Sequence, residues 1–347
     1  MKLRFVTRIQ QDDALSRPRT DPGELQKYSE WHHFNFNDDA NGLYGVLNLA
    51  LSGNIQDPAQ GRAGVSLVVC DRKKGWRGTM NLYSIEEARF SPGSVDLQIG
   101  ANSVRFRKDR YLVSAALKDG SVVLKASWTP EASAIRVDNI GGMINTFILP
   151  RLAVEGSVRI AGCEYRIEGA TGYHDHNWGY WNWGTDLGWD WGYLIQSPPR
   201  TRNGSPPVSI VFGQVTDATR AAAKSDLVLL VWVGERCAQV FLDEAVDIAT
   251  AGELTGVAIP RVPGVMALLA PPRVSGIPRQ LRIRAEDGED RVEIRMDVEN
   301  ALQFLVPHPV GGGTTTIAEL VGPYQAQGVL GGRAFAFTYA GFAELAG

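Results

Sequence analysis

The stretch 172–193 constrains this chain most strongly, because aromatic and polar residues follow one another through it almost without interruption. It contains five of the nine tryptophans and two of the five histidines in the chain. Indole and imidazole rings carry polar nitrogens that need partners when the rings are buried. The stretch must therefore build an unusually polar core or line a cavity that holds an apolar molecule.

Short strands joined by tight turns are predicted for the rest of the chain. Asp-Gly pairs at 119–120 and 287–288 each follow one alternating run and precede another, which predicts two hairpins. Residues 226–233 are apolar nearly throughout, as in a strand buried on both faces. The best helix candidate is the short segment 243–254. We therefore expect an all-β protein of sandwich or barrel type.

A strand is also expected at residues 30–36, where two faces alternate. One face carries Trp31, His33 and Asn35, and the other carries His32, Phe34 and Phe36. An acidic residue precedes tryptophan both here, at Glu30, and later at Asp190. This weak echo predicts two related barrels, formed by residues 1–188 with an N-terminal arm and by residues 189–347.

Composition excludes several classes of protein. The formal net charge is −3 and the basic residues form no block, so nucleic acid is not expected as a partner. The three cysteines, Cys70, Cys163 and Cys237, lie far apart without a Cys-x-x-Cys pair, which predicts buried reduced thiols. There is no secretory signal and no apolar run of membrane-spanning length, so we expect a soluble, cytoplasmic protein.

The motif Tyr173-His174-Asp175-His176-Asn177-Trp178-Gly179, followed by Trp189-Asp190-Trp191-Gly192, resembles the carotenoid 1,2-hydratase (hydroxyneurosporene synthase) superfamily. Glu30-Trp31 and the closing segment 339–344 look like the opening and closing strands of that family. The resemblance implies two packed lipocalin-like (calycin) β-barrels, and no redox cofactor or metal. Its hydratases add water to a terminal isoprenoid double bond, whereas related fungal Diels-Alderases fold a linear polyene for cycloaddition. It also implies a proton-delivering Tyr and Asp after the motif, where Asp190 is the nearest acidic candidate.

Hydration of an alkene requires an acid that protonates carbon and pocket-lining groups that stabilise the resulting cation. A carboxyl group in a dry pocket keeps its proton because desolvation raises its pKa, and indole faces attract cations. We expect Asp175 or Asp190 to be the acid, His176 or His174 to position water, and Tyr173 to relay a proton. The expected substrate contacts are Trp31, His174, Asn177, Trp178, Trp181 and Trp191.

Two other interpretations of the motif stay open at this point. Asp175 and the histidines could form a buried hydrogen-bond network that only fixes the fold. Alternatively, His174 and His176, with His32 or His33 nearby, could bind zinc or iron. Asn, Trp and Tyr crowd the motif and no carboxylate–histidine spacing typical of a metal enzyme occurs, so we expect neither metal nor cofactor.

The sequence thus predicts a redox-neutral enzyme that hydrates or cyclises an elongated isoprenoid or polyene, which it reaches through a passing contact with a membrane. One alternative is a cyclase that acts by shape on a polyketide-type polyene, where the aromatic walls supply orientation. Another is a protein that binds an apolar ligand without changing it.

Overall fold

The computed structural model describes residues 1–19, 21–196, 206–220, 226–267, 276–308 and 313–347. Strands make up about 65% of the chain, which confirms the predicted all-β class. Contacts between Cα atoms divide the chain into two compact units. The first unit comprises residues 1–183 and 307–313, and the second comprises residues 184–306 and 314–347. The sequence prediction placed the division at residue 188.

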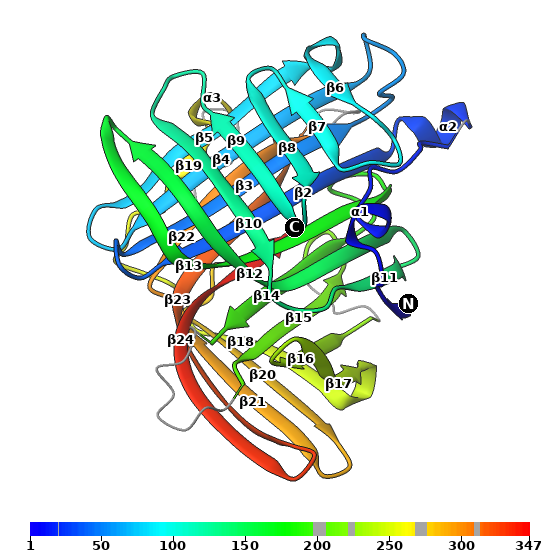
Figure 1. Cartoon of the computed structure of the whole chain (residues 1–347). Helices are drawn as coiled ribbons and strands as arrows, with labels where there is room; N and C mark the ends of the chain where they lie inside the picture. The colour runs from blue at the N-terminus through cyan, green and yellow to red at the C-terminus, as the bar shows by residue number, and fades with distance from the viewer. Residues whose placement is uncertain (20, 197–205, 221–225, 268–275, 309–312) are drawn as a thin grey trace. The chain divides into compact units, whose positions relative to one another are not determined.

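The first unit is an antiparallel sheet that curls into a nearly closed barrel (Figure 1). Within the described residues it has 13 strands, in the order β5-β4-β3-β2-β13-β12-β10-β9-β8-β7-β6, with β11 paired to both β12 and β1. β4 packs against β7, β9 and β10, so the two ends of the sheet face each other. The elements are β1 (Lys2–Phe5), α1 (Ile9–Asp12), α2 (Pro22–Leu25), β2 (Tyr28–Asp38), β3 (Leu43–Ser52), β4 (Arg62–Asp71), β5 (Gly75–Ser84), η1 (Ile85–Glu87), β6 (Ala88–Phe90), β7 (Asp96–Ile99), β8 (Asn102–Arg107), β9 (Arg110–Ala116), β10 (Val122–Pro130), β11 (Ile135–Ile140), β12 (Ile144–Ile160) and β13 (Cys163–Tyr180).

The second unit is also a nearly closed barrel, with 11 strands among its described residues. Their order is β17-β16-β15-β14-β24-β23-β21-β20-β18, and β22 pairs with both β23 and the short parallel strand β19. The elements are β14 (Gly188–Ile195), β15 (Val208–Thr216), β16 (Val228–Val233), β17 (Arg236–Leu242), η2 (Asp243–Ala245), β18 (Val246–Ala251), β19 (Arg261–Val262), α3 (Gly264–Ala267), β20 (Gln280–Asp287), β21 (Asp290–Asp297), β22 (Asn300–Pro307), β23 (Thr314–Leu330) and β24 (Arg333–Ala346).

The two sheets share the strand order around their opening strands and closing hairpin, as an internal repeat requires, although the first sheet has two further strands at one end. In each unit the first strands run outward in chain order, as β2 to β5 and as β14 to β17. The long closing hairpin of each unit, β12–β13 or β23–β24, then pairs beside the first of these strands. Glu30 on β2 and Asp190 on β14, which suggested the echo, therefore lie on equivalent strands.

The predicted hairpins are confirmed, and one predicted helix is wrong. β9 pairs with β10 across residues 117–121, and β20 pairs with β21 across Gly288. Segment 243–254 forms only the single turn η2, followed by β18, which pairs with β20. Pairing with a neighbouring strand satisfies the backbone of this segment, so its weak helical pattern does not decide the structure. None of the helices in the described ranges is of a length and apolarity that would let it span a bilayer.

The N-terminal arm is ordered, whereas the cysteines differ in part from expectation. Residues 1–15 are fixed to the first barrel, because β1 pairs with β11 and Leu15 exchanges backbone hydrogen bonds with Gly93 and Ser94. All three cysteines are free thiols, but only Cys70 is buried as expected. Cys237 is half-buried, and Cys163 is exposed, since it begins β13 at a turn.

Glycines of the motif stretch are required where another element approaches closely. A Cβ atom at Gly172 would lie 2.5 Å from Val154 and 2.6 Å from the indole of Trp128. At Gly179 it would lie 2.0 Å from the carbonyl oxygen of Met143. The absence of a side chain at these positions therefore lets β12 and the core rings pack against β13.

Gly172→Ala is expected to lower the free energy of unfolding of the first unit by about 1–3 kcal/mol, because the added methyl overpacks the core. Gly64→Ala on β4 is the matched control, since its Cβ atom would meet nothing closer than 3.8 Å. Urea denaturation followed by tryptophan fluorescence measures both. Equal stability of the two variants would show that the close approach to Trp128 is unimportant.

Candidate functional site

Strand β13 carries the motif, and its alternation divides the motif residues between two faces. His174, His176 and Trp178 point into the barrel core, where His174 packs with Phe34 and Tyr111 and His176 packs with Trp178. The other face carries Tyr173, Asp175 and Asn177, which lie opposite Asn35, His33 and Trp31 of β2. The residues predicted to form one site therefore belong to separate groups.

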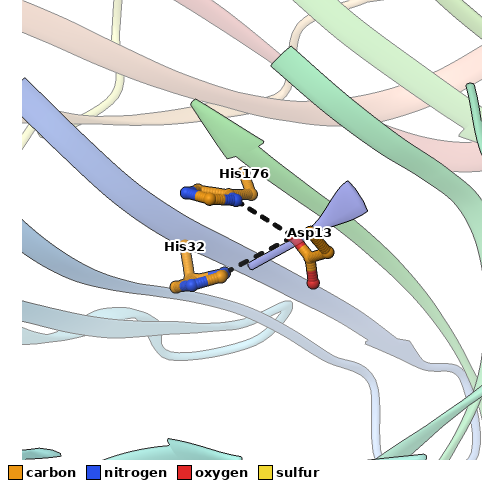
Figure 2. A group of neighbouring side chains, drawn as sticks. All are labelled: Asp13, His32 and His176. Atoms are coloured by element: carbon orange, nitrogen blue, oxygen red, sulfur yellow. Dashed lines mark ion pairs between the residues drawn. The ribbon is translucent and has the colours of Figure 1, made fainter. Parts of the chain in front are cut away.

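A buried carboxylate from the N-terminal segment organises the inward face. Asp13 Oδ2 accepts a hydrogen bond of 2.6 Å from the Tyr111 hydroxyl and lies 3.1 Å from His174 Nε2. Asp13 Oδ1 lies 3.1 Å from His176 Nδ1 and 3.8 Å from His32 Nδ1. Figure 2 shows the rings of His32 and His176 together on one side of this carboxylate, where they stack with their centroids 4.1 Å apart. We call Asp13, His32, His174 and His176 the inner cluster; all four are fully buried.

Glu30 is a second buried carboxylate that contacts the inner cluster. Its Oε1 lies 2.9 Å from His176 Nε2 and accepts a hydrogen bond from the backbone N–H of Ser16. The Tyr28 hydroxyl donates to Oε2 of the same carboxylate. His176 is therefore held between two carboxylates, one at each ring nitrogen.

The surroundings set distinct charge states within the inner cluster. Burial opposes ionisation of Asp13, but the attraction and hydrogen bonds of His174 and His176 outweigh it and hold the pKa of Asp13 well below its usual value. Burial also works against the charged form of His176, yet its contacts with Asp13 and Glu30 raise its pKa to about 9. For His32, burial and the neighbouring His176 lower the pKa well below the usual value, so this ring is neutral.

The outward face of β13 holds a carboxyl group with two donors. Asp175 is 4% exposed, and it accepts hydrogen bonds of 2.7 Å from the Tyr173 hydroxyl and 2.6 Å from the Asn177 amide. His33 is its cross-strand neighbour and contacts the side-chain oxygens of Asn35 and Asn48. We call Tyr173, Asp175 and Asn177 the outer row.

Three indoles gather beside the outer row. Trp31 lies 5.7 Å from Trp181 and 6.2 Å from Trp183 between ring centroids, and the latter two rings are 5.5 Å apart. Trp181 is almost fully buried, whereas Trp31 and Trp183 are half-buried. These residues form the indole cluster, whose partly open rings offer an apolar surface next to Asp175.

The remaining predicted residues have other partners. Trp178 faces the core, 4.7 Å from the His176 ring, with the guanidinium of Arg136 over its own ring. Asp190 belongs to the second unit, where it accepts hydrogen bonds from the Arg220 guanidinium and the Gln214 amide. Trp191, also in the second unit, packs over Gly213.

Two buried carboxylates, Asp13 of the inner cluster and Glu30 beside it, were not predicted as site residues from the sequence. Asp13 lies in a polar segment without periodicity, and its partners are more than a dozen residues away in sequence. Glu30 did carry a signal, because it shares its strand face with His32 and Phe34 and must therefore point inward. Among the described residues, Asp13, His32 and His176 have ligand atoms close enough together to hold a metal ion.

No family model and no curated protein sequence matches this chain. Solved structures do share its fold over nearly its full length. The Nitrosomonas europaea protein NE1406, assigned as an AttH, aligns with a TM-score of 0.62 at 12% identity and covers 92% of both chains. Kievitone hydratase from Nectria haematococca aligns with a TM-score of 0.57 at 11% identity and covers 97% of both chains.

CghA, solved with Sch210972, aligns with a TM-score of 0.54 at 11% identity and covers 99% of this chain and 98% of its own. These likenesses confirm the double lipocalin-like fold that the sequence resemblance implied.

Asp13→Ala is expected to lower the free energy of unfolding of the first unit by about 3–5 kcal/mol, because it leaves the buried imidazoles without their carboxylate. The neighbouring substitution Asp12→Ala removes a partly exposed ion pair with Arg4 and should cost less than about 1 kcal/mol. Chemical denaturation measures both. Similar losses for the two variants would contradict a central role for Asp13.

Proposed function

We propose that this protein is a redox-neutral enzyme that binds an elongated apolar alkene and hydrates or cyclises it, with Asp175 as the proton donor. The observation that carries the proposal is the placement of a nearly buried carboxyl group beside three indoles. Two side-chain donors fix its orientation. A general acid must be held in this way to deliver a proton to one carbon of a substrate.

In hydration, the Asp175 proton forms the new C–H bond, and the alkene becomes a tertiary cation. Water then adds to the cation, and the proton that it loses returns to Asp175 through the Tyr173 hydroxyl. Indole faces stabilise a desolvated cation by about 2 kcal/mol or more. Trp31 lies diagonally across the strand pair from Asp175, so the indole cluster is suited to receive the cationic carbon. In cyclisation, another double bond of the substrate attacks the cation in place of water.

His174 and His176 do not enter this proposal, because they lie on the opposite face of β13 from Asp175. The basic group nearest to the outer row is His33, the cross-strand partner of Asp175. Asp190, which accepts hydrogen bonds from Arg220 and Gln214, is likewise left out as proton donor. The proposal therefore rests on the outer row and the indole cluster.

The structural relatives support this class of reaction without specifying the substrate. One of them is named a hydratase, and CghA was solved with Sch210972. At 11–12% identity, these relatives support a reaction of the hydratase or cyclase class, but they do not distinguish hydration from cyclisation. Isoprenoids and polyketide-type polyenes are the substrates to test.

Asp175→Asn is expected to reduce product formation at least about 100-fold while binding of the alkene survives, because the amide has no acidic proton to give. The assay incubates the purified chain with linear isoprenoid alkenes and linear polyenes, and mass spectrometry detects a gain of one water or an isomer. Glu168→Gln, an exposed change on the same strand, is the matched control.

Full activity of Asp175→Asn would contradict the proposal. If Trp31→Ala and Trp183→Ala then reduced product formation more than Asp175→Asn does, the protein would be a cyclase that acts by shape and not by acid catalysis. Recovery of every bound alkene unchanged would instead identify a binding protein.

A further inference from the structure

We propose that Asp13, His32 and His176 bind one divalent first-row transition-metal ion, of which zinc is the representative. This inference is independent of the proposed reaction, which takes place on the opposite face of β13. The three ligand atoms are Asp13 Oδ1, His32 Nδ1 and His176 Nδ1, and all lie within 4.8 Å of one another. Ligands bound at zinc distances in a tetrahedral site are about 3.3 Å apart. The observed separations of 3.1 and 3.8 Å from Asp13 Oδ1 lie on either side of that value.

The other atoms of two of these side chains are already occupied. Asp13 Oδ2 is taken by Tyr111 and His174, which leaves Oδ1 directed at the two other imidazoles. His176 Nε2 is taken by Glu30, which leaves Nδ1 directed at Asp13. A metal-binding histidine typically donates its second N–H to a carboxylate, and a metal-binding carboxylate is itself hydrogen-bonded. Asp13 and His176 have this arrangement in the structure, whereas the stacked rings of His32 and His176, with centroids 4.1 Å apart, have to turn for both nitrogens to face one ion.

One of the candidate ligand atoms lacks a partner, and the other two face only each other. His32 Nδ1 is buried without a hydrogen bond, while Asp13 Oδ1 and His176 Nδ1 form an ion pair at 3.1 Å. His32 is fully buried, and its Nε2 is unpartnered as well. Buried polar groups without partners are costly. An ion coordinated by all three atoms satisfies each of them at once.

Charge and donor type define the class of ion. Asp13 and Glu30 bring two carboxylates into a core whose other members are imidazoles and phenols, so a dication balances the cluster. As the ion binds, His176 loses the proton on Nδ1 to solvent and keeps the N–H that Glu30 accepts. Two imidazoles and one carboxylate suit zinc and similar ions, whereas magnesium and calcium prefer oxygen donors throughout.

The ligands come from three parts of the first unit. Asp13 follows α1 in the N-terminal segment, His32 is on β2 and His176 is on β13 (Figure 2). The ion would therefore fasten the N-terminal segment to the central strand pair of the barrel.

The test uses the full chain after removal of metal with a chelator. Isothermal titration with zinc should give one site per chain, and cobalt should give visible bands of a nitrogen- and oxygen-ligated ion without a thiolate band. Zinc should raise the melting temperature of the first unit. His32→Ala and Asp13→Asn should weaken zinc binding at least about 100-fold, since even loss of an outer partner costs 10–100-fold.

His33→Ala is the matched control, because His33 is adjacent on the same strand but belongs to the opposite face. It should keep the zinc site. Absence of zinc binding by the wild-type chain would overturn the proposal. Equal binding by His32→Ala, or a thiolate band with cobalt, would also overturn it by locating the ion elsewhere. If either variant fails to fold, as circular dichroism would reveal, the wild-type stoichiometry and cobalt spectrum decide.

Discussion

The first barrel depends on one carboxylate that lies among imidazoles in its core. Asp13 is fully buried, and its two oxygens face Tyr111, His174, His176 and His32. An ionised group in such a place is stable only while its partners remain. Because Asp13 comes from the N-terminal segment and its partners come from the barrel strands, this interaction also makes the segment part of the barrel.

Strand β13 separates two tasks by the simple alternation of its side chains. Its inward residues complete a dry polar network, whereas its outward residues place Asp175 next to the indole cluster. The network keeps β13 and β2 in register, and register decides which residues reach the outward face. A fixed inner face is thus the physical condition for a precisely positioned outer row.

Much of the fold was predictable, because strand period and turn chemistry are local properties. The Asp-Gly hairpins and the alternation of residues 30–36 followed from neighbouring residues alone. The same period, applied to residues 173–178, separates Asp175 from His176, and the sequence prediction missed this by treating the motif as one site. Asp13 could not have been found, since its role arises from contacts with strands far along the chain, and nothing in its own neighbourhood marks it. The prediction of a short helix at 243–254 was wrong because a contact distant in sequence, the pairing of β18 with β20, outweighs local propensity.

Hydrogen–deuterium exchange of Asp13→Asn tests this account most directly, because the substitution removes the charge and keeps the shape of the side chain. The account predicts faster amide exchange in residues 1–15, in β2 and in β13, with unchanged exchange in the distant strand β5. Unchanged exchange in β2 and β13 would contradict the claim that the buried carboxylate holds the centre of the barrel together.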